Sequence, residues 1–107
     1  MPRTYPKIVI HTVTGEFRSS TTVVEQPWED PGPGQVLVRN RFAGCNAIFD
    51  TNLCRNTIRY VDVVPPFDMG IESVGEIEAV GPGVKGFAPG DAVATTKIGS
   101  AYREYQL

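Results

Sequence analysis

The chain has 107 residues, of which 41% are hydrophobic and 21% are charged, and its formal net charge is −2. This composition is ordinary for one small globular domain, and the charge gives no electrostatic reason to expect a nucleic acid or an anionic membrane as a partner. No apolar run approaches the ~20 residues of a membrane helix, and the apolar core near the N-terminus is too brief for a secretory signal. We therefore expect a cytoplasmic or organelle-matrix protein.

The first third of the chain predicts two short strands joined by a turn. Residues 7–13 (KIVIHTV) are rich in β-branched side chains, and Gly15 can turn the chain after them. Residues 21–25 (TTVVE) are expected to form the returning strand of the pair. Residues 27–34 (PWEDPGPG) then form a connector that no helix tolerates, because proline removes backbone donors and fixes φ.

Residues 35–42 (QVLVRNRF) alternate between apolar and polar side chains. Alternation with a period of two is typical of a strand that has one buried face. On this pattern Val36, Val38 and Phe42 share the apolar face, and the two arginines lie on the other. This is the clearest strand that the sequence predicts.

Residues 46–56 (NAIFDTNLCRN) are the only plausible helix. Ile48, Phe49 and Leu53 give this helix a weak apolar stripe, while its aspartate and asparagines lower the helix propensity. The paired prolines at 65 and 66 end whatever structure precedes them.

The segment 70–93 (GIESVGEIEAVGPGVKGFAPGDAV) places glycines between short apolar runs. Glycine is used where φ must be positive or where two backbones pass closely. Ile77 and Ala79 are expected to face inward from a strand, with the alternate side chains in solvent. Two further strands over 91–96 and 101–107 complete a mainly β fold, a small barrel or sandwich with at most one or two short helices.

The glycine-rich segment resembles the signature of the medium-chain dehydrogenase/reductase superfamily, which runs G-H-E-x-x-G, V-G-x-x-V and G-D-x-V. The matching residues are Gly70, Glu72, Gly75, Val80, Gly81, Val84, Gly90, Asp91 and Val93. The resemblance covers essentially the whole chain, including VLVRNRFAGCNA at 36–47 and PPFDMGIES at 65–73. It implies that residues 1–107 form the N-terminal domain of an alcohol dehydrogenase-like enzyme. That domain is GroES-like, a partly open β-barrel, and the Rossmann cofactor domain is absent from this chain.

Two positions depart from the zinc-dependent members that the chain resembles. Ile71 stands where those members carry a histidine ligand, and Asn46 stands where they carry a cysteine ligand. Neither side chain is a zinc donor. Cys45 and Cys54 lie upstream of the lobe that holds a structural zinc in many relatives, so we expect no zinc. Two cysteines nine residues apart form neither a disulfide framework nor a zinc-ribbon spacing. We therefore expect reduced thiols, and a redox-sensing pair or a metal site is the alternative. The resemblance points to the zinc-free branch, near quinone oxidoreductases and prostaglandin-type enone reductases.

In that branch the asparagine that matches Asn46 lines the pocket beside the nicotinamide and the substrate carbonyl. Asn46 is therefore the predicted catalytic and cofactor-binding residue, because its amide can donate to an oxygen that gains negative charge. The alternative is a loop asparagine that satisfies local backbone groups. Asp50 and Tyr60 are the predicted substrate-binding residues. Asp50 comes one position later than the family's aspartate, and Tyr60 has the alternative of a surface or packing role.

Glu72 follows the missing histidine. The resemblance implies that it lies near the domain junction as a buried structural acid. Its expected partners are backbone donors or an arginine such as Arg39 or Arg41.

A bare G-x-G-x-x-G string occurs at 81–86 (GPGVKG), but its proline and the following GFAPGD cannot form the helix that a dinucleotide fingerprint requires. NADPH should therefore be bound mainly by the missing domain. The predicted function is the catalytic and substrate domain of an NADPH-dependent, zinc-independent reductase of quinones or α,β-unsaturated ketones, inactive alone. The alternative is a free-standing GroES-like module that associates like a co-chaperonin. A homo-oligomer is possible in both cases.

Overall fold

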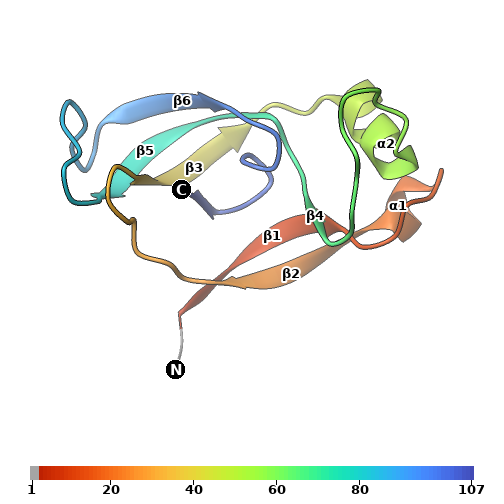
Figure 1. The fold of residues 1–107 in the computed structure, drawn as a ribbon, viewed down its shortest axis with the longest axis horizontal. Helices are drawn as coiled ribbons and strands as arrows, with labels where there is room; N and C mark the ends of the chain where they lie inside the picture. Colours follow the sequence, from red (N-terminus) through yellow and green to blue (C-terminus); the bar gives the residue numbers. More distant parts are fainter. Residues whose placement is uncertain (1–2) are drawn as a thin grey trace.

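The computed structural model describes residues 3–107, which form two antiparallel sheets and two short helices (Figure 1). The three-stranded sheet has the order β2-β1-β4, and the four-stranded sheet has the order β6-β5-β3-β7. The strands of the two sheets are β1 (Thr4–Ile10), β2 (Thr21–Pro27), β3 (Val36–Ala43), β4 (Phe67–Asp68), β5 (Glu72–Val80), β6 (Ala92–Thr96) and β7 (Tyr105–Gln106). The sheets do not close into a barrel. The expected mainly β architecture with at most two short helices is confirmed.

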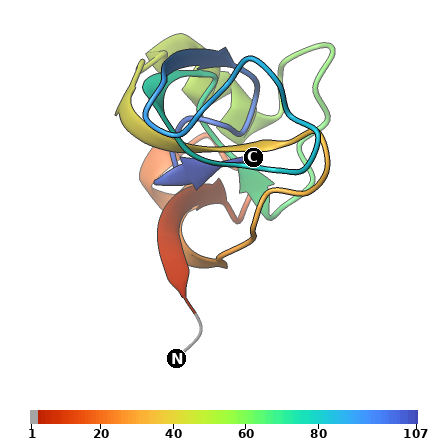
Figure 2. The same cartoon turned by 90° about the vertical axis from the view of Figure 1, so that its left-hand side faces the viewer.

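The predicted N-terminal hairpin is present, and the sequence missed one detail of its connection. β1 and β2 pair antiparallel, with Ile8 opposite Val23. The segment between them contains the helix α1 (Phe17–Ser20), not only a turn. Ser20 ends this helix in a fully buried position and donates its hydroxyl to the carbonyl of Thr12 at 2.6 Å. Figures 1 and 2 show the β1–β2 pair extending away from the four-stranded sheet.

The predicted face of β3 is wrong. Leu37 and Val38 are adjacent yet only 2% and 3% exposed, while Phe42 is 75% exposed. The pairing of β3 with β5 shifts register between Leu37 and Val38, and again between Asn40 and Phe42. Such bulges turn the following side chains to the other face of a sheet, so simple alternation fails at these two points.

β5 has the predicted orientation, and its glycine has a steric reason. Ile77 is 2% exposed, whereas Val74 on the opposite face is 48% exposed. A Cβ on Gly75 would collide with the carbonyl oxygen of Arg39 on the neighbouring strand. The two backbones can lie this close only because residue 75 lacks a side chain.

The core lies in two clusters. One lies beneath the second helix, α2 (Ala47–Arg55), and consists of Ile10, Leu53, Cys54, Val63 and Met69. The other consists of Tyr5, Leu37 and Tyr105. The last predicted strand, over 101–107, is reduced to the two residues of β7.

The α2 helix turns a different face inward from the predicted stripe. Its buried residues are Asp50, Leu53 and Cys54, while Ile48 is 81% exposed. The buried set has the spacing i, i+3, i+4 of one helical face. Among the described residues, neither helix is long and apolar enough to cross a membrane.

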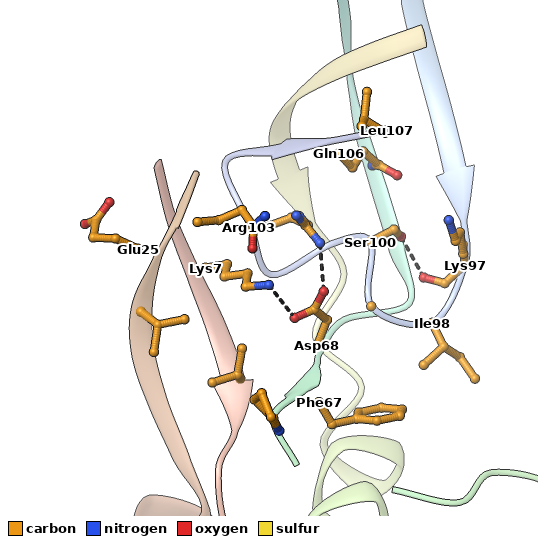
Figure 3. A pocket seen from close by; sticks show the side chains of 15 residues that line it. Lys7, Glu25, Phe67, Asp68, Lys97, Ile98, Ser100, Arg103, Gln106 and Leu107 are labelled. Atoms are coloured by element: carbon orange, nitrogen blue, oxygen red, sulfur yellow. Dashed lines mark hydrogen bonds and ion pairs between the residues drawn. The ribbon is translucent and has the colours of Figure 1, made fainter. Parts of the chain in front are cut away.

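A cluster of charged residues ties the three-stranded sheet to the segment that leads into β7. Asp68 accepts from Lys7 Nζ at 2.8 Å and from Arg103 Nη1 at 2.9 Å. Arg103 also donates to the hydroxyl of Tyr5 at 2.6 Å and to the carbonyl of Tyr105 at 2.7 Å. Lys7, Asp68 and Arg103 border a hollow of about 550 Å³ (Figure 3). Their charges are directed at one another, which indicates a structural role.

Candidate functional site

The candidate site lies where β3 ends and α2 begins. Asn46 occupies the position before the first helical residue, where an asparagine usually accepts hydrogen bonds from free backbone N–H groups. Its side chain makes no such capping bond. Instead Nδ2 donates to the carbonyl of Gly44 at 3.4 Å and to Oε1 of Glu72 at 3.3 Å. Both contacts are long for N–H···O bonds, so the amide is held only weakly.

Glu72 reaches this loop because of the pairing of β3 with β5. Ala43 is opposite Ser73, and the backbone N–H of Gly44 donates to the carbonyl of Glu72 at 3.0 Å. A Cβ on Gly44 would collide with the Glu72 side chain, so the glycine makes room for the carboxylate. The expected partnership of Glu72 with an arginine is wrong, because Arg41 pairs with Glu76 and Glu72 accepts from Asn46. Its expected burial is wrong as well, since Glu72 is exposed at the start of β5.

The side chain of Asn46 lines a pocket of about 580 Å³ beside the first turn of α2. The lining residues are Asn46, Ala47, Ile48, Phe49, Asn52, Ile58 and Tyr60. Ile48 and Tyr60 are each 81% exposed. The pocket therefore combines apolar walls with a few polar groups, which is the usual composition of a small-molecule site.

The structure brings two of the three predicted site residues together. Asn46 and Tyr60 line the same pocket, whereas Asp50 does not line it. Asp50 is only 6% exposed, and Tyr102 donates to its Oδ2 at 2.6 Å. Asp50 borders a separate hollow that Tyr102 and Cys45 also line.

Burial controls the protonation of this carboxyl and its tyrosine partner. Burial raises the pKa of Asp50, and the hydrogen bond from Tyr102 lowers it by less. The pKa of Tyr102 is raised as well, by burial first and then by its hydrogen bond to Asp50. The tyrosine hydroxyl consequently remains a hydrogen-bond donor up to strongly alkaline pH.

Asn46 contributes a side-chain amide to this site, and Glu72 contributes the carboxylate that this amide contacts. Residues 3–107 contain no group of three or more His, Cys, Asp or Glu side chains that could hold a metal ion. Cys45 and Cys54 are both free thiols, the first exposed and the second buried. The expectation that the site works without zinc remains a prediction, based on the side-chain chemistry of Ile71 and Asn46.

Sequence reasoning missed the Asn46–Glu72 contact and the apolar walls of the pocket. The two residues are 26 positions apart, so only strand pairing brings them together. The predicted buried stripe of the helix includes Ile48. Ile48 follows Asn46 by two residues, and the buried face of the helix starts only at Asp50. This position is the signal that could have placed Ile48 in the pocket.

Residues 32–106 match the family of the alcohol dehydrogenase GroES-like domain. The chain belongs to this family. It is 37% identical to prostaglandin reductase-3 of Mus musculus over 100% of the chain and 28% of that protein. The resemblance to medium-chain dehydrogenases/reductases of the quinone oxidoreductase and prostaglandin reductase kind is thereby confirmed.

Two solved structures extend the comparison. The quinone oxidoreductase of Pseudomonas syringae pv. Tomato is 36% identical with a TM-score of 0.77, over 95% of this chain and 30% of that one. The Escherichia coli quinone oxidoreductase complexed with NADPH is 27% identical with a TM-score of 0.76, over 94% of this chain and 30% of that one. The chain thus spans less than a third of the length of these relatives.

Proposed function

We propose that residues 1–107 form the substrate side of an NADPH-dependent, zinc-independent reductase of quinones or α,β-unsaturated ketones. The observation that carries this proposal is the side chain of Asn46, which makes no capping bond to the helix and lines a largely apolar pocket. The names of the relatives, a prostaglandin reductase and two quinone oxidoreductases, support the reaction class. The family membership favours this function over a co-chaperonin-like module.

Asn46 would act as a hydrogen-bond donor to the carbonyl oxygen of the substrate. Its two present contacts are long, so an incoming oxygen can replace one of them at little cost. A preorganised donor stabilises an oxygen best while that oxygen gains negative charge. Glu72 would keep the amide nitrogen, rather than the amide oxygen, directed toward the substrate, because a carboxylate accepts and does not donate.

The residues around Asn46 fit a nicotinamide ring. Ile48 and Tyr60 offer exposed apolar and aromatic surface next to a side-chain amide, and these three residues would hold the ring. The cofactor would supply hydride, while the protein orients the substrate and excludes water. The GPGVKG segment forms a turn in which the N–H of Val84 donates to the carbonyl of Gly81 at 3.4 Å, and no helix follows before β6. We therefore assign the rest of NADPH binding to a second, Rossmann domain.

The proposal is tested by NADPH oxidation with an enone or a quinone as acceptor. We expect no robust turnover by residues 1–107 alone. A fusion in which this chain replaces the equivalent domain of the Pseudomonas syringae quinone oxidoreductase should turn over. A fusion that binds NADPH but reduces neither acceptor would contradict the assignment, as would robust turnover by the chain alone. Light scattering on the isolated chain addresses the rival, since a closed ring of subunits would favour the co-chaperonin-like module.

A further inference from the structure

A second pocket lies beside the two helices and has no part in the proposed reaction. Its volume is about 510 Å³, within the usual range of small-molecule sites. It is lined by Ile8, Phe17, Ala43, Cys45, Ala47, Asp50, Thr51 and Tyr102. Phe17 belongs to α1, and the lining residues from 47 to 51 belong to α2, which lies at the same end of the molecule (Figure 1). Of the lining residues only Ala47 also borders the Asn46 pocket, so the two sites are separate.

Apolar groups form most of the wall of this pocket. Ile8 and two alanines contribute aliphatic surface, and Phe17, which is 40% exposed, contributes an aromatic ring. The ring of Tyr102 is a second aromatic surface. An apolar molecule gains free energy when it covers such walls, and an aromatic ring packs well against other rings.

The hydroxyl groups of the pocket have already committed their hydrogens. Tyr102 donates to Oδ2 of Asp50 at 2.6 Å, and Thr51 donates to the carbonyl of Ala47 at 2.9 Å. A hydroxyl carries a single hydrogen, so both groups can now only accept from an occupant. The thiol of Cys45 is a weak donor. The side chains of this pocket therefore favour an occupant that brings its own hydrogen-bond donor.

Asp50 provides the acceptor for that donor. The residue is only 6% exposed, and its Oδ1 is buried without a hydrogen-bond partner. Buried polar atoms are almost always paired, so an orphaned oxygen on a residue that lines a pocket indicates a missing partner. A ligand hydroxyl satisfies this oxygen in both protonation states, because it donates to a carboxylate and accepts from a carboxylic acid. A ketone or ether oxygen only accepts, so it cannot satisfy the carboxylate.

Water and ammonium groups fit this pocket less well than a hydroxyl on an apolar body. An ordered water needs two to four polar partners, and these walls are mostly hydrocarbon. An ammonium group would have to leave water as a full charge, which costs more than the burial of a hydroxyl. A molecule with one hydroxyl needs only the contact with Asp50, and its apolar body covers the rest of the wall.

We propose that this pocket binds an alkylphenol, whose hydroxyl donates to Oδ1 of Asp50. The ring of the ligand packs against Phe17 and Tyr102, and its alkyl group covers the aliphatic part of the wall. A phenol is favoured over an alkanol, because its ring matches the aromatic surfaces and its more acidic O–H is the stronger donor.

The first test compares two probes of similar shape on residues 1–107. 4-Propylphenol carries the hydroxyl donor, whereas the methyl ether 4-propylanisole can only accept. Calorimetric titration should show the phenol binding about tenfold more tightly, since the ether leaves a buried acceptor unsatisfied. Equal affinities would overturn the proposal, because water would then satisfy Oδ1 equally well. Failure of the phenol to bind would overturn it too.

Asp50→Asn tests the role of the carboxyl. Tyr102 still needs an acceptor, so the amide oxygen should take the position of Oδ2 and the amide nitrogen that of Oδ1. This nitrogen donates to an ether oxygen as well, so the preference for the phenol should fall to about twofold or less. Asp30→Asn changes an exposed aspartate outside the pocket and is the matched control, which should keep the full preference. A full preference in Asp50→Asn would contradict the proposed contact.

Thr51→Phe tests the location of the site. The larger side chain fills the pocket and should weaken 4-propylphenol binding about tenfold, the effect of about two methylene groups losing apolar contact. The matched control Thr22→Phe changes an exposed threonine on β2 and should bind like wild type. Unchanged affinity in folded Thr51→Phe would overturn the proposal, and the probe pair decides it where this variant does not fold. NADPH and a second domain take no part, so failure of the reductase assay leaves every outcome unaffected.

Discussion

Tyr102 donates its hydroxyl to Asp50 at 2.6 Å, although the two residues are 52 positions apart. Asp50 lies in α2, and Tyr102 lies in the segment before β7. The backbone of Tyr102 is also fixed, because its N–H donates to Met69 and its carbonyl accepts from Ile8. The pair therefore joins the helix that begins the candidate site to the rest of the fold.

Removal of the tyrosine hydroxyl should destabilise the protein. In Tyr102→Phe, Oδ2 of Asp50 loses its donor while Oδ1 already has none. Leaving a buried acceptor unsatisfied costs about 1–3 kcal/mol, and we expect a loss of this size in the free energy of unfolding, measured in urea. Tyr60→Phe is the matched control, because Tyr60 is 81% exposed, and its stability should be unchanged. Equal stability of both variants would contradict the structural role of the pair.

The stability contributed by Asp50 should decrease as pH rises. Burial raises the pKa of Asp50 in the folded state, so the folded protein binds more protons than the unfolded chain between the two pKa values. Stability therefore falls with increasing pH from about 3.9, the ordinary aspartate value, up through the raised pKa. Asp50→Asn removes this titration. Urea unfolding of both proteins at acidic and neutral pH should show wild type losing stability relative to the variant, and parallel curves would contradict the raised pKa.

The ion cluster at Asp68 should contribute more stability than the surface pair of the other sheet. The side chains of Lys7 and Arg103 are each 15% exposed, and both bind the carboxylate of Asp68. Asp68→Asn leaves two poorly solvated cations without their counter-charge, and we expect a loss of about 1–3 kcal/mol. Glu76→Gln breaks the pair with Arg41, whose side chains are 38% and 47% exposed, and should cost about 0–1 kcal/mol. Denaturant unfolding measures the stability loss of each variant. Similar losses in Asp68→Asn and Glu76→Gln would contradict the larger contribution of the Asp68 cluster.

Gly75→Ala should be destabilising for a steric reason. The new methyl group would collide with the carbonyl oxygen of Arg39, so β3 and β5 must move apart. Forced overpacking of this kind costs about 1–3 kcal/mol. In Gly15→Ala the nearest atom to the new methyl group is 3.9 Å away, so its stability should stay within about 0.5 kcal/mol of wild type. Thermal unfolding of wild type and both variants measures these stabilities. Wild-type stability in Gly75→Ala would contradict the close approach of β3 and β5.

Asn46→Ala should impair turnover in the fusion described above. Loss of one preorganised donor to a developing oxyanion lowers kcat by about 10²–10³-fold. Folding should be little affected, because the Asn46 side chain makes no capping bond and only two long contacts. Steady-state kinetics with an enone acceptor measure the effect. Asn56→Ala, at the other end of α2 and outside the pocket, is a control for kcat, and wild-type kcat in Asn46→Ala would remove the residue from the mechanism.

The sequence by itself determined the class of fold and the loop on which the site lies. Turn residues and alternation predicted the β1–β2 pair and the orientation of β5, because these depend on local φ preferences and a period of two. The glycine-rich segment carried the family resemblance, and Asn46 followed from it. These features depend on neighbours in sequence.

Only the tertiary structure decided which side chains meet. The bulges of β3 turned Phe42 into solvent, and packing of α2 on the core buried Asp50 beside a different pocket from the one that Asn46 and Tyr60 line. The partners of the two central polar side chains, Glu72 for Asn46 and Tyr102 for Asp50, come from distant segments. Strand register and helix rotation place such partners, and both are set by the packing of the whole domain, which no local pattern encodes.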